Sequence, residues 1–362
     1  MEYSLRASGK GMSGIRAGDQ VDLKDRMLAE LNQTNCSACC CSSENRILSV
    51  IFMITLSLAI LLGNCIILAV FLGTKHYRTA QGYLKTSLAV ADLALGILVV
   101  PFSVYREITP LFLESPSQEG AHDGMLFYSW HPCYLVGPVF AGCTLVSIST
   151  IFLLAIERSV AIFKPLHKEV VITRKRTLLL ILLSWLSSFF LAMIPIIFSQ
   201  GGIVVEYNDC SRMCNYAPAP ASSARVWQIL LLFPAFDFSL LGATLIINAL
   251  SLTSIHQYTR RRKLLSGTDQ EPLKFSFSDI KAAKTIGALT VAFTVSFTPI
   301  AVFVVGNVLG YQWCTFSFFA FWVLASNSCC NVIIYSVCDQ RFREGARQLF
   351  KSVQCYCKRP SR

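Results

Sequence analysis

The chain has 362 residues, of which 54% are hydrophobic and 15% are charged, and its formal net charge is +11. Ordinary soluble domains have about 25% charged residues, and a mean hydropathy of +0.53 would leave large apolar patches exposed to water. The composition therefore excludes a soluble enzyme, a disordered protein and a small disulfide scaffold. It predicts a protein with several membrane spans.

Long apolar stretches recur along the chain. A helix needs about 20 apolar residues to cross the hydrocarbon core, and lipid offers the backbone no hydrogen-bond partners outside the helix. Seven stretches are long enough, namely residues 47–73, 86–105, 133–156, 177–199, 226–252, 285–311 and 315–337. We therefore expect an all-α membrane protein, a seven-transmembrane helix bundle over residues 47–337 between an N-terminal tail, 1–46, and a C-terminal tail, 338–362.

Lysine and arginine are distributed unevenly between the two sides of this bundle. The segments 74–85, 157–176, 253–284 and 338–362 carry 23 of the 32 basic residues, and the segments on the other side carry 9. Because cytoplasmic loops are enriched in Lys and Arg, we expect a plasma-membrane protein with its C-terminus in the cytoplasm and its N-terminus outside. The basic side then contacts anionic membrane lipids rather than nucleic acid, with an additional cytoplasmic partner as the alternative.

The segments expected outside carry signs of the secretory route. Asn32 and Asn35 begin two Asn-X-Ser/Thr sequons, which are acceptors for glycosylation. Eight of the 15 cysteines lie outside or at the outer helix ends, where disulfides persist: Cys36, Cys39, Cys40, Cys41, Cys133, Cys210, Cys214 and Cys314. Eight cysteines allow 105 pairings, so the connectivity stays open. A bridge from Cys133 to Cys210 or Cys214 would pin the loop after the fourth span over the bundle.

Short motifs occur in a fixed order along the spans. They are Gly63-Asn64, Leu88-Ala89-Val90-Ala91-Asp92-Leu93, Cys133 followed 25 residues later by Arg158 in Glu157-Arg158-Ser159, Lys164-Pro165-Leu166, Trp185, Pro195, Pro234, Phe293-Thr294-Val295-Ser296-Phe297-Thr298-Pro299 and Asn331-Val332-Ile333-Ile334-Tyr335. In this order and spacing, the chain resembles the rhodopsin-like (class A) G-protein-coupled receptors. The resemblance implies a receptor without enzymatic activity that passes an extracellular or membrane-borne ligand signal to a heterotrimeric G protein.

The resemblance also implies a set of switch residues. Arg158, beside Glu157, is expensive to bury unless it is paired, and it would bridge to Asp279, so that outward movement of the sixth helix breaks the bridge. Pro299 removes a backbone hydrogen bond and kinks that helix. The remaining members are Phe293, Phe297, Asn331 and Tyr335. The alternative is that Arg158 and Asp279 are ordinary interfacial charges.

Two carboxylates lie inside the expected spans, Asp92 and Asp237, and burying such groups is expensive. Asp237 has no counterpart in the resemblance. Asp92 belongs, by resemblance, to a sodium pocket made of Asp92, Ser147, Asn327, Ser328 and Asn331. Hard oxygen ligands around one carboxylate suit a small hard cation. A polar network without an ion is the alternative, and no other cofactor is expected.

The expected ligand pocket is apolar. Phe140 stands where amine receptors carry an aspartate, and Ala325 stands where opsins carry the retinal-binding lysine. The candidate wall residues are hydrophobic and aromatic: Phe140, Ile300, Ala301, Val304, Phe318, Phe321 and Trp322. They suit a hydrophobic small-molecule or lipid-like ligand, with Arg106 and Glu107 as candidate polar contacts. Alternatively, several of them simply face lipid or the core.

Four positions depart from the family pattern, all in the switching machinery: Ser159, Gly242, Phe297 and Val332. A non-signalling or decoy seven-helix receptor is therefore the alternative function. A transporter is a weaker rival, because secondary transporters are built from internal repeats and the sequence has no such symmetry.

Beyond the seventh span, apolar residues recur at helical spacing between basic ones, at Phe342, Ala346, Leu349 and Phe350. This pattern predicts a short amphipathic eighth helix on the inner leaflet. Two cysteines just beyond it are candidate palmitoylation sites, Cys355 and Cys357.

Overall fold

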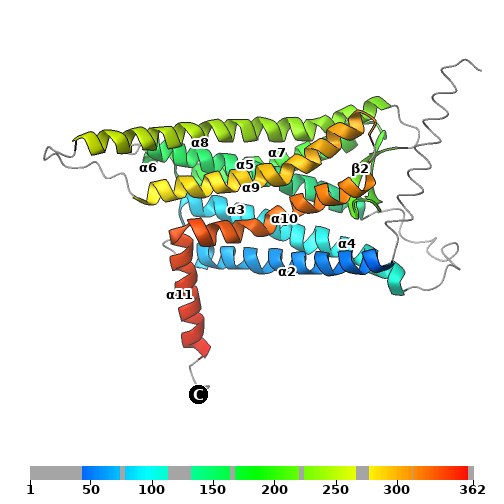
Figure 1. Cartoon of the computed structure of the whole chain (residues 1–362), viewed down its shortest axis with the longest axis horizontal. Coiled ribbons are helices and arrows are strands. Elements are labelled where there is room, and N and C mark those ends of the chain that lie inside the picture. The colour runs from blue at the N-terminus through cyan, green and yellow to red at the C-terminus, as the bar shows by residue number, and fades with distance from the viewer. Residues whose placement is uncertain are drawn as a thin grey trace, which may run out of the picture.

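The computed structural model describes residues 43–73, 78–112, 132–163, 168–219, 224–265, 277–311 and 313–357. Long helices run side by side through the molecule (Figure 1). They are α2 (Ser43–Gly73), α3 (Ala80–Ala94), α4 (Val100–Phe112), α5 (Cys133–Phe163), α7 (Arg174–Phe198), α8 (Leu232–Leu265), α9 (Phe277–Val308) and α10 (Cys314–Cys338). A π-helical turn, η2 (Leu95–Val99), joins α3 to α4 in one span, and the described residues contain seven spans long and apolar enough to cross a membrane. The expected seven-helix bundle is confirmed.

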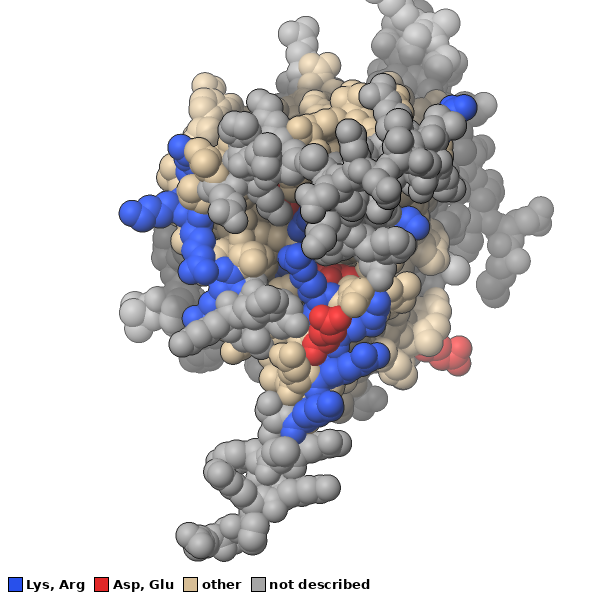
Figure 2. Space-filling view, turned by 90° about the vertical axis from the view of Figure 1, so that its left-hand side faces the viewer, with Lys and Arg blue, Asp and Glu red and all other residues tan. Residues whose placement is uncertain are grey.

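The two ends of the bundle differ. At one end, which we call the hairpin end, β1 (Ile203–Asn208) and β2 (Met213–Pro218) form an antiparallel hairpin, and the 3-10 helix η4 (Ala224–Leu231) leads into α8. At the other end lie α6 (Lys168–Val171) and α11 (Gln340–Cys357), and α11 leaves across the direction of the long helices (Figure 1). Figure 2 shows Lys and Arg side chains gathered there; we call it the basic end, and its described basic residues include Arg78, Arg174, Lys175, Arg176, Arg341 and Arg343.

α5 is the central helix of the bundle. Its apolar segment is 78% buried, against 22% for that of α7, because α5 packs against α3, α7, α8 and α9. Glycine permits one of these contacts, since a Cβ added at Gly142 would lie 2.9 Å from Cδ1 of Phe189. α5 therefore presents side chains to the interior at both ends of the bundle.

The second span begins earlier than the sequence predicted. α3 starts at Ala80 rather than at residue 86, and the side chain of its N-cap, Thr79, accepts a hydrogen bond from the Gly82 backbone N–H at 3.3 Å. Lys85, expected in a loop, therefore lies inside the helix and is only 2% exposed. The predicted boundary is wrong because hydropathy counts lysine against a span, whereas an ion pair with Asp339 permits its burial here.

The expected eighth helix is present as α11. Asp339 precedes it, and Oδ1 of Asp339 accepts hydrogen bonds from the backbone N–H groups of Arg341 at 2.9 Å and Phe342 at 3.3 Å. The Phe342 ring is buried against the rings of Phe71 and Tyr335. The cap and this aromatic contact fix the start of α11 to α2 and α10.

Candidate functional site

Two disulfides fasten the hairpin to the helices. Cys133 at the start of α5 is bonded to Cys214 in β2, and Cys210 in the hairpin turn is bonded to Cys314 at the start of α10. Of the two partners that the sequence left open for Cys133, the structure has Cys214. The hairpin is thus held over the bundle by covalent bonds to two different helices.

A buried polar cluster also holds the hairpin. Nη1 of Arg212 lies 3.1 Å from Oε2 of Glu107, and the Tyr207 hydroxyl donates to Oε1 of Glu107 at 2.8 Å. Arg106 lies over the Tyr207 ring, 5.0 Å from its centroid. Burial and the neighbouring Glu107 carboxylate raise the pKa of the Tyr207 hydroxyl, so this group remains a donor. Arg106 and Glu107 therefore contact the hairpin, and neither lines the cavity below it.

An apolar cavity of about 90 Å³ lies between the hairpin, α5, α8, α9 and α10. Cys214, Asn215 and Tyr216 of β2 form part of its wall, so the hairpin covers it. Five of the seven predicted wall residues line the cavity: Phe140, Ile300, Ala301, Val304 and Phe321. Helical spacing places these residues on inward faces of α5, α9 and α10, and their contact with a ligand stays a prediction.

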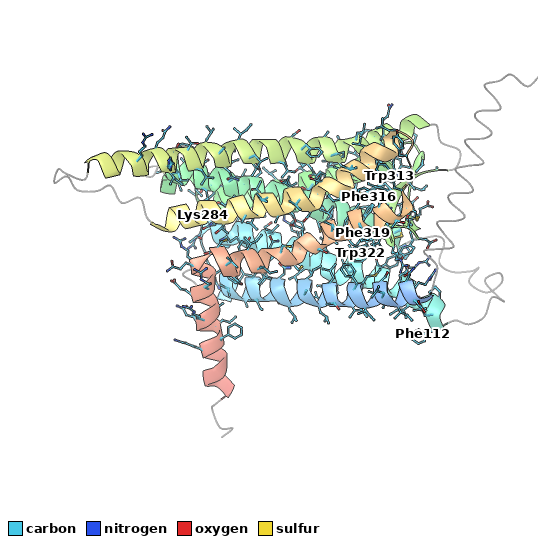
Figure 3. All side chains as sticks on the ribbon, in the orientation of Figure 1. Phe112, Lys284, Trp313, Phe316, Phe319 and Trp322 are labelled. Carbon is cyan, nitrogen blue, oxygen red and sulfur yellow. A yellow bond between two sulfur atoms is a disulfide. The ribbon has the colours of Figure 1, made fainter. Side chains whose placement is uncertain are left out.

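Phe318 and Trp322 do not line this cavity, so the structure does not bring these two predicted wall residues together with the other five. The Trp322 indole N–H donates to the Ser211 carbonyl at 2.9 Å, and the Arg212 guanidinium lies 5.9 Å from the Phe318 ring centroid. Both aromatic rings also contact Phe52 of α2. The physical reason is that α10 is buried on more than one side, and Figure 3 places Trp322 in the half of the bundle near the hairpin.

Polar groups of the cavity wall mostly have partners. The Thr144 hydroxyl donates to the Phe140 carbonyl at 2.9 Å, and the Tyr216 hydroxyl donates to the Ala192 carbonyl at 2.8 Å. Asp237 of α8 is the exception: it is 2% exposed, and its Oδ1 has no hydrogen-bond partner within the described part of the chain. The sequence marked this residue as an intramembrane charge without a role, and helical spacing along the fifth span was the signal that could have placed it in the wall.

Asp92 lies in a second buried polar cluster. Its Oδ2 accepts a hydrogen bond from Nδ2 of Asn331 at 2.7 Å, whereas its Oδ1 has no partner among the residues described. Asn64 donates to the Ser328 carbonyl at 2.9 Å, and its own side-chain oxygen is also unpartnered in that part of the structure. The other predicted pocket residues are buried as well: Ser147 and Asn327. Unpartnered carboxylate and amide oxygens are ligands that fit a small hard cation.

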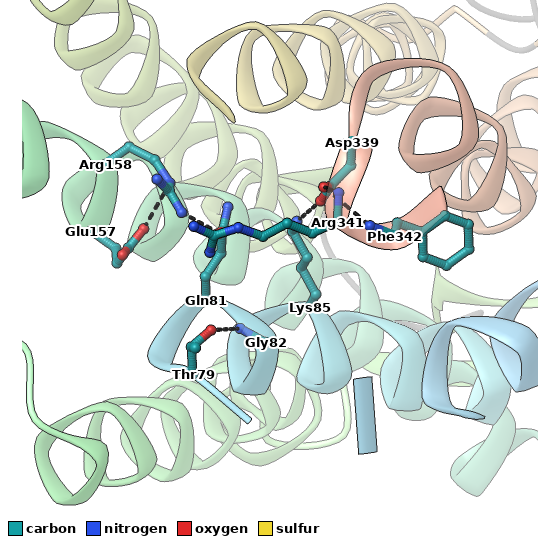
Figure 4. Close-up of polar contacts among 9 residues, drawn as sticks. All are labelled: Thr79, Gln81, Gly82, Lys85, Glu157, Arg158, Asp339, Arg341 and Phe342. Atoms are coloured by element: carbon teal, nitrogen blue, oxygen red, sulfur yellow. Dashed lines mark hydrogen bonds and ion pairs between the residues drawn. The ribbon is translucent and has the colours of Figure 1, made fainter. Parts of the chain in front are cut away.

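A third polar cluster lies at the basic end (Figure 4). Arg158 of α5 is ion-paired with Glu157, with 3.0 Å between Nε and Oε2, and its Nη2 donates to the side-chain oxygen of Gln81. Lys85, one turn along α3 from Gln81, is ion-paired with Asp339. Polar contacts therefore connect α5 with α3, and α3 with the start of α11.

Lys85 and Asp339 stabilise each other in this cluster. The Lys85 ammonium lies 4.9 Å from the Tyr335 ring centroid and 5.2 Å from that of Phe71. Burial opposes ionisation of Asp339, but the Lys85 charge and the backbone N–H groups of α11 outweigh it and hold the pKa of Asp339 below its usual range. Sequence reasoning missed Gln81 and Lys85; their four-residue spacing, which puts both on one helix face, was the available signal.

The other switch residues lie mainly in α9. Phe293 and Phe297 stack with their ring centroids 5.9 Å apart, and Pro299 lies inside the helix. The side chain of Asp279 lies outside the described residues, so the expected bridge to Arg158 stays a prediction. The same holds for the candidate modification sites at Asn32, Asn35, Cys355 and Cys357.

Comparison with known proteins decides the family. The model of the family described as "7 transmembrane receptor (rhodopsin family)" matches residues 63–335, well over half of the chain. The chain belongs to this rhodopsin family of receptors. The family is one of membrane receptors and not of enzymes.

Several known relatives cover most of this receptor. It is 26% identical to "Rhodopsin, GQ-coupled" of Mizuhopecten yessoensis over 82% of its own length, but spans only 58% of that protein. It is 24% identical to the "Alpha-1A adrenergic receptor" of Oryzias latipes, over 90% of this chain and 72% of that one. It is 26% identical to "Probable G-protein coupled receptor 21" of Mus musculus, over 86% of this chain and 85% of that one. At these identities the relatives support the family, and each ligand named belongs to its own protein.

Proposed function

We propose that this receptor lies in the plasma membrane and passes a signal from a hydrophobic ligand, bound below the hairpin, to a heterotrimeric G protein at the basic end. The observation that carries the proposal is the arrangement along α5, where Phe140 lines the cavity and Arg158 joins the polar cluster at the opposite end. One central helix thus bears a ligand-facing and a partner-facing residue. The positive-inside rule then puts the hairpin end and N-terminus outside and the C-terminus in the cytoplasm.

The cavity supports a hydrophobic small-molecule or lipid-like ligand. Its wall consists largely of aromatic and aliphatic side chains, as in other small-molecule sites. Phe140 offers no carboxylate for an amine on α5, and Ala325 offers no amine for a retinal Schiff base. The ligand chemistry named for the adrenergic and rhodopsin relatives is therefore not carried over to these positions.

The basic end supports contact with a G protein and with membrane lipids. Lysines and arginines gather on this face (Figure 2), where they complement acidic surfaces and anionic headgroups. Arg158 is held by Glu157 and Gln81, and it must leave these contacts to meet a partner. A ligand shifts such an equilibrium only through its different affinity for the two arrangements.

A sodium ion at Asp92 is part of the proposal. The unpartnered side-chain oxygens of Asp92 and Asn64 supply hard ligands within a buried cluster. Further oxygens belong to the predicted pocket residues Ser147, Asn327, Ser328 and Asn331. When bound, the ion supplies a positive charge that offsets the cost of burying the Asp92 carboxylate.

A non-signalling receptor is the second candidate, and two departures from the family pattern favour it. The Ser159 hydroxyl donates back to the Ile156 carbonyl of its own helix at 2.9 Å, so it offers α5 no interhelical contact. At Gly242 no atom lies within 4 Å of an added Cβ, so α8 contributes no side chain at the position where a tyrosine is common. Neither position carries the tyrosine that is usual there in the family.

Second-messenger levels separate the two candidates. Cyclic AMP and calcium are measured, without added ligand, in cells that express the wild type, Arg158→Ala, or the control Glu206→Ala at matched surface expression. We expect that Arg158→Ala lowers the basal signal, because the G-protein contact is damaged, and that replacing the exposed Glu206 of the hairpin end does not change it. Equal levels in all three and in untransfected cells would favour the non-signalling receptor.

A further inference from the structure

We infer that the cavity binds a compact aromatic ammonium compound, with its cationic group against the carboxylate of Asp237 on α8. The inference rests on the proposed role of the cavity as the ligand site. It favours the small molecule over the lipid-like ligand and adds a cationic group to it. Its basis is an acidic side chain, 2% exposed, in a wall that is otherwise uncharged among the described residues.

Helical geometry directs Asp237 toward the cavity. Phe233, Pro234 and Asp237 of α8 all line it, and spacings of three and four residues mark a single helix face. The next residue, Phe238, is 49% exposed and belongs to the outer side of α8. Asp237 therefore points between the helices and away from lipid, where a charge would be most costly.

Among the described residues, Asp237 lacks the kind of partner that the buried carboxylates of Glu107 and Asp92 have. Glu107 is paired with Arg212, and Asp92 accepts a hydrogen bond from Asn331. For Asp237, by contrast, the described residues supply no partner to Oδ1, and no Lys, Arg or His of the described chain lines the cavity. A buried carboxylate without a partner is strongly unfavourable, so a ligand cation would complete the site.

The rest of the wall selects the body of the ligand. Five phenylalanines line the cavity and attract both an aromatic ring and an ammonium group: Phe140, Phe233, Phe297, Phe303 and Phe321. A volume of about 90 Å³ suits a compact molecule rather than a long acyl chain. A carboxylate or phosphate ligand would place a second negative charge beside Asp237. A small aryl ammonium compound satisfies all three conditions.

Three benzene derivatives of similar size test the charge preference: benzylamine is cationic near neutral pH, benzyl alcohol is neutral and benzoate is anionic. The purified full-length receptor is titrated with each, and the apparent Kd is obtained from the rise in Tm. We expect the Kd of benzylamine to be about 10-fold lower than that of benzyl alcohol, since a desolvated charge pair favours the amine. Benzoate should not raise the Tm.

Variants of Asp237 test whether this side chain causes the preference for benzylamine over benzyl alcohol. In Asp237→Asn, the Kd values of benzylamine and benzyl alcohol should differ by less than about 2-fold, because the amide has no negative charge to pair with the ammonium group. Asp237→Leu serves as a second variant, since its side chain suits the apolar wall if the amide impairs folding. Thr253→Val is the control on the same helix: it removes a hydroxyl that bonds to the Ala249 carbonyl and does not line the cavity, so the amine preference should persist.

The outcomes are distinct. Equal Kd values for benzylamine and benzyl alcohol in the wild type would overturn the ammonium inference and leave the apolar cavity as the ligand site. An amine preference that persists in both Asp237 variants would place the cation elsewhere and also overturn it. If none of the three compounds raises the Tm of the wild type at millimolar concentration, the cavity fails as the proposed ligand site as well.

Discussion

The hairpin end and the basic end of this receptor are held by different kinds of bonds. At the hairpin end, two disulfides and the buried Glu107–Arg212 pair tie the cavity cover to α4, α5 and α10. At the basic end, Arg158 and Lys85 are held by ion pairs and hydrogen bonds. Covalent bonds fix one end, whereas the contacts described at the other can exchange partners.

This difference indicates where a conformational change can occur. The two disulfides tie the starts of α5 and α10 to the same hairpin in every arrangement, so a ligand beneath the hairpin has little freedom to move that end apart. Ion pairs and hydrogen bonds at the basic end exchange protein partners for water or another protein at modest net cost. We therefore expect ligand binding near Phe140 to be expressed mainly as movement around Arg158.

The largest expected effect concerns the disulfide of the fixed end. Cys133→Ser removes the bond to Cys214, which spans a sequence separation of 81 residues. In the chain-entropy model, closing a loop of this length contributes about 4 kcal/mol to stability. We expect a large loss of surface expression and of Tm, while Cys65→Ser, at an exposed free cysteine, changes little. Unchanged trafficking of the Cys133 variant would show that the hairpin is held without this bond.

The next effect concerns the ion pair of the basic end. Lys85→Met leaves the carboxylate of Asp339 without its partner, which should lower stability by about 3 kcal/mol. The double variant Lys85→Met/Asp339→Asn should recover part of this loss, because Asn keeps the cap of α11 without the charge. Tm values of the purified variants measure the loss in the single variant and the recovery in the double variant. Lys351→Met, at an exposed lysine, is the control. Additive losses in the double variant would argue against direct coupling.

A smaller effect is expected on lowering the pH. The folded pKa of Asp339 is below its usual range, so its contribution to stability is complete above the unfolded pKa of about 4. That contribution is lost as the pH falls through the folded pKa. Between neutral pH and about pH 3, the Tm of the wild type should therefore fall further than that of Asp339→Asn. If the Tm of both proteins falls equally with pH, the ion pair with Lys85 does not lower the pKa of Asp339.

The smallest expected effect concerns sodium. The wild type should have a higher Tm in sodium chloride than in potassium chloride at equal ionic strength. The free energy of unfolding should rise by about 1 kcal/mol when the sodium concentration is a few times its Kd. Asp92→Asn removes the only full negative charge of the pocket and should abolish the difference. If the wild-type Tm is the same in both salts, the Asp92 cluster is a polar network without a bound ion.

Sequence alone predicted the bundle because membrane spans depend on local composition, which hydropathy reads directly. It also predicted the cavity side of α9, since Ile300, Ala301 and Val304 follow helical spacing. It failed where a side chain's partner comes from a distant segment. The partner that permits the burial of Lys85 is Asp339, which lies 254 residues away in the chain. Trp322 is held outside the cavity wall by the hydrogen bond from its indole N–H to the Ser211 carbonyl.

The contrast between the two ends is tested most directly by spin-label distances in the purified receptor. Spin-labelled unnatural amino acids, which spare the native cysteines, are placed at two exposed residues of the basic end, Arg174 and Lys284, of which Figure 3 labels Lys284. A second pair is placed at Tyr134 and Leu309 near the hairpin. We predict that a nucleotide-free G protein, of the class identified by the second-messenger assay, lengthens the basic-end distance and leaves the hairpin-end distance unchanged. Equal changes at both ends, or no change at either, would contradict this.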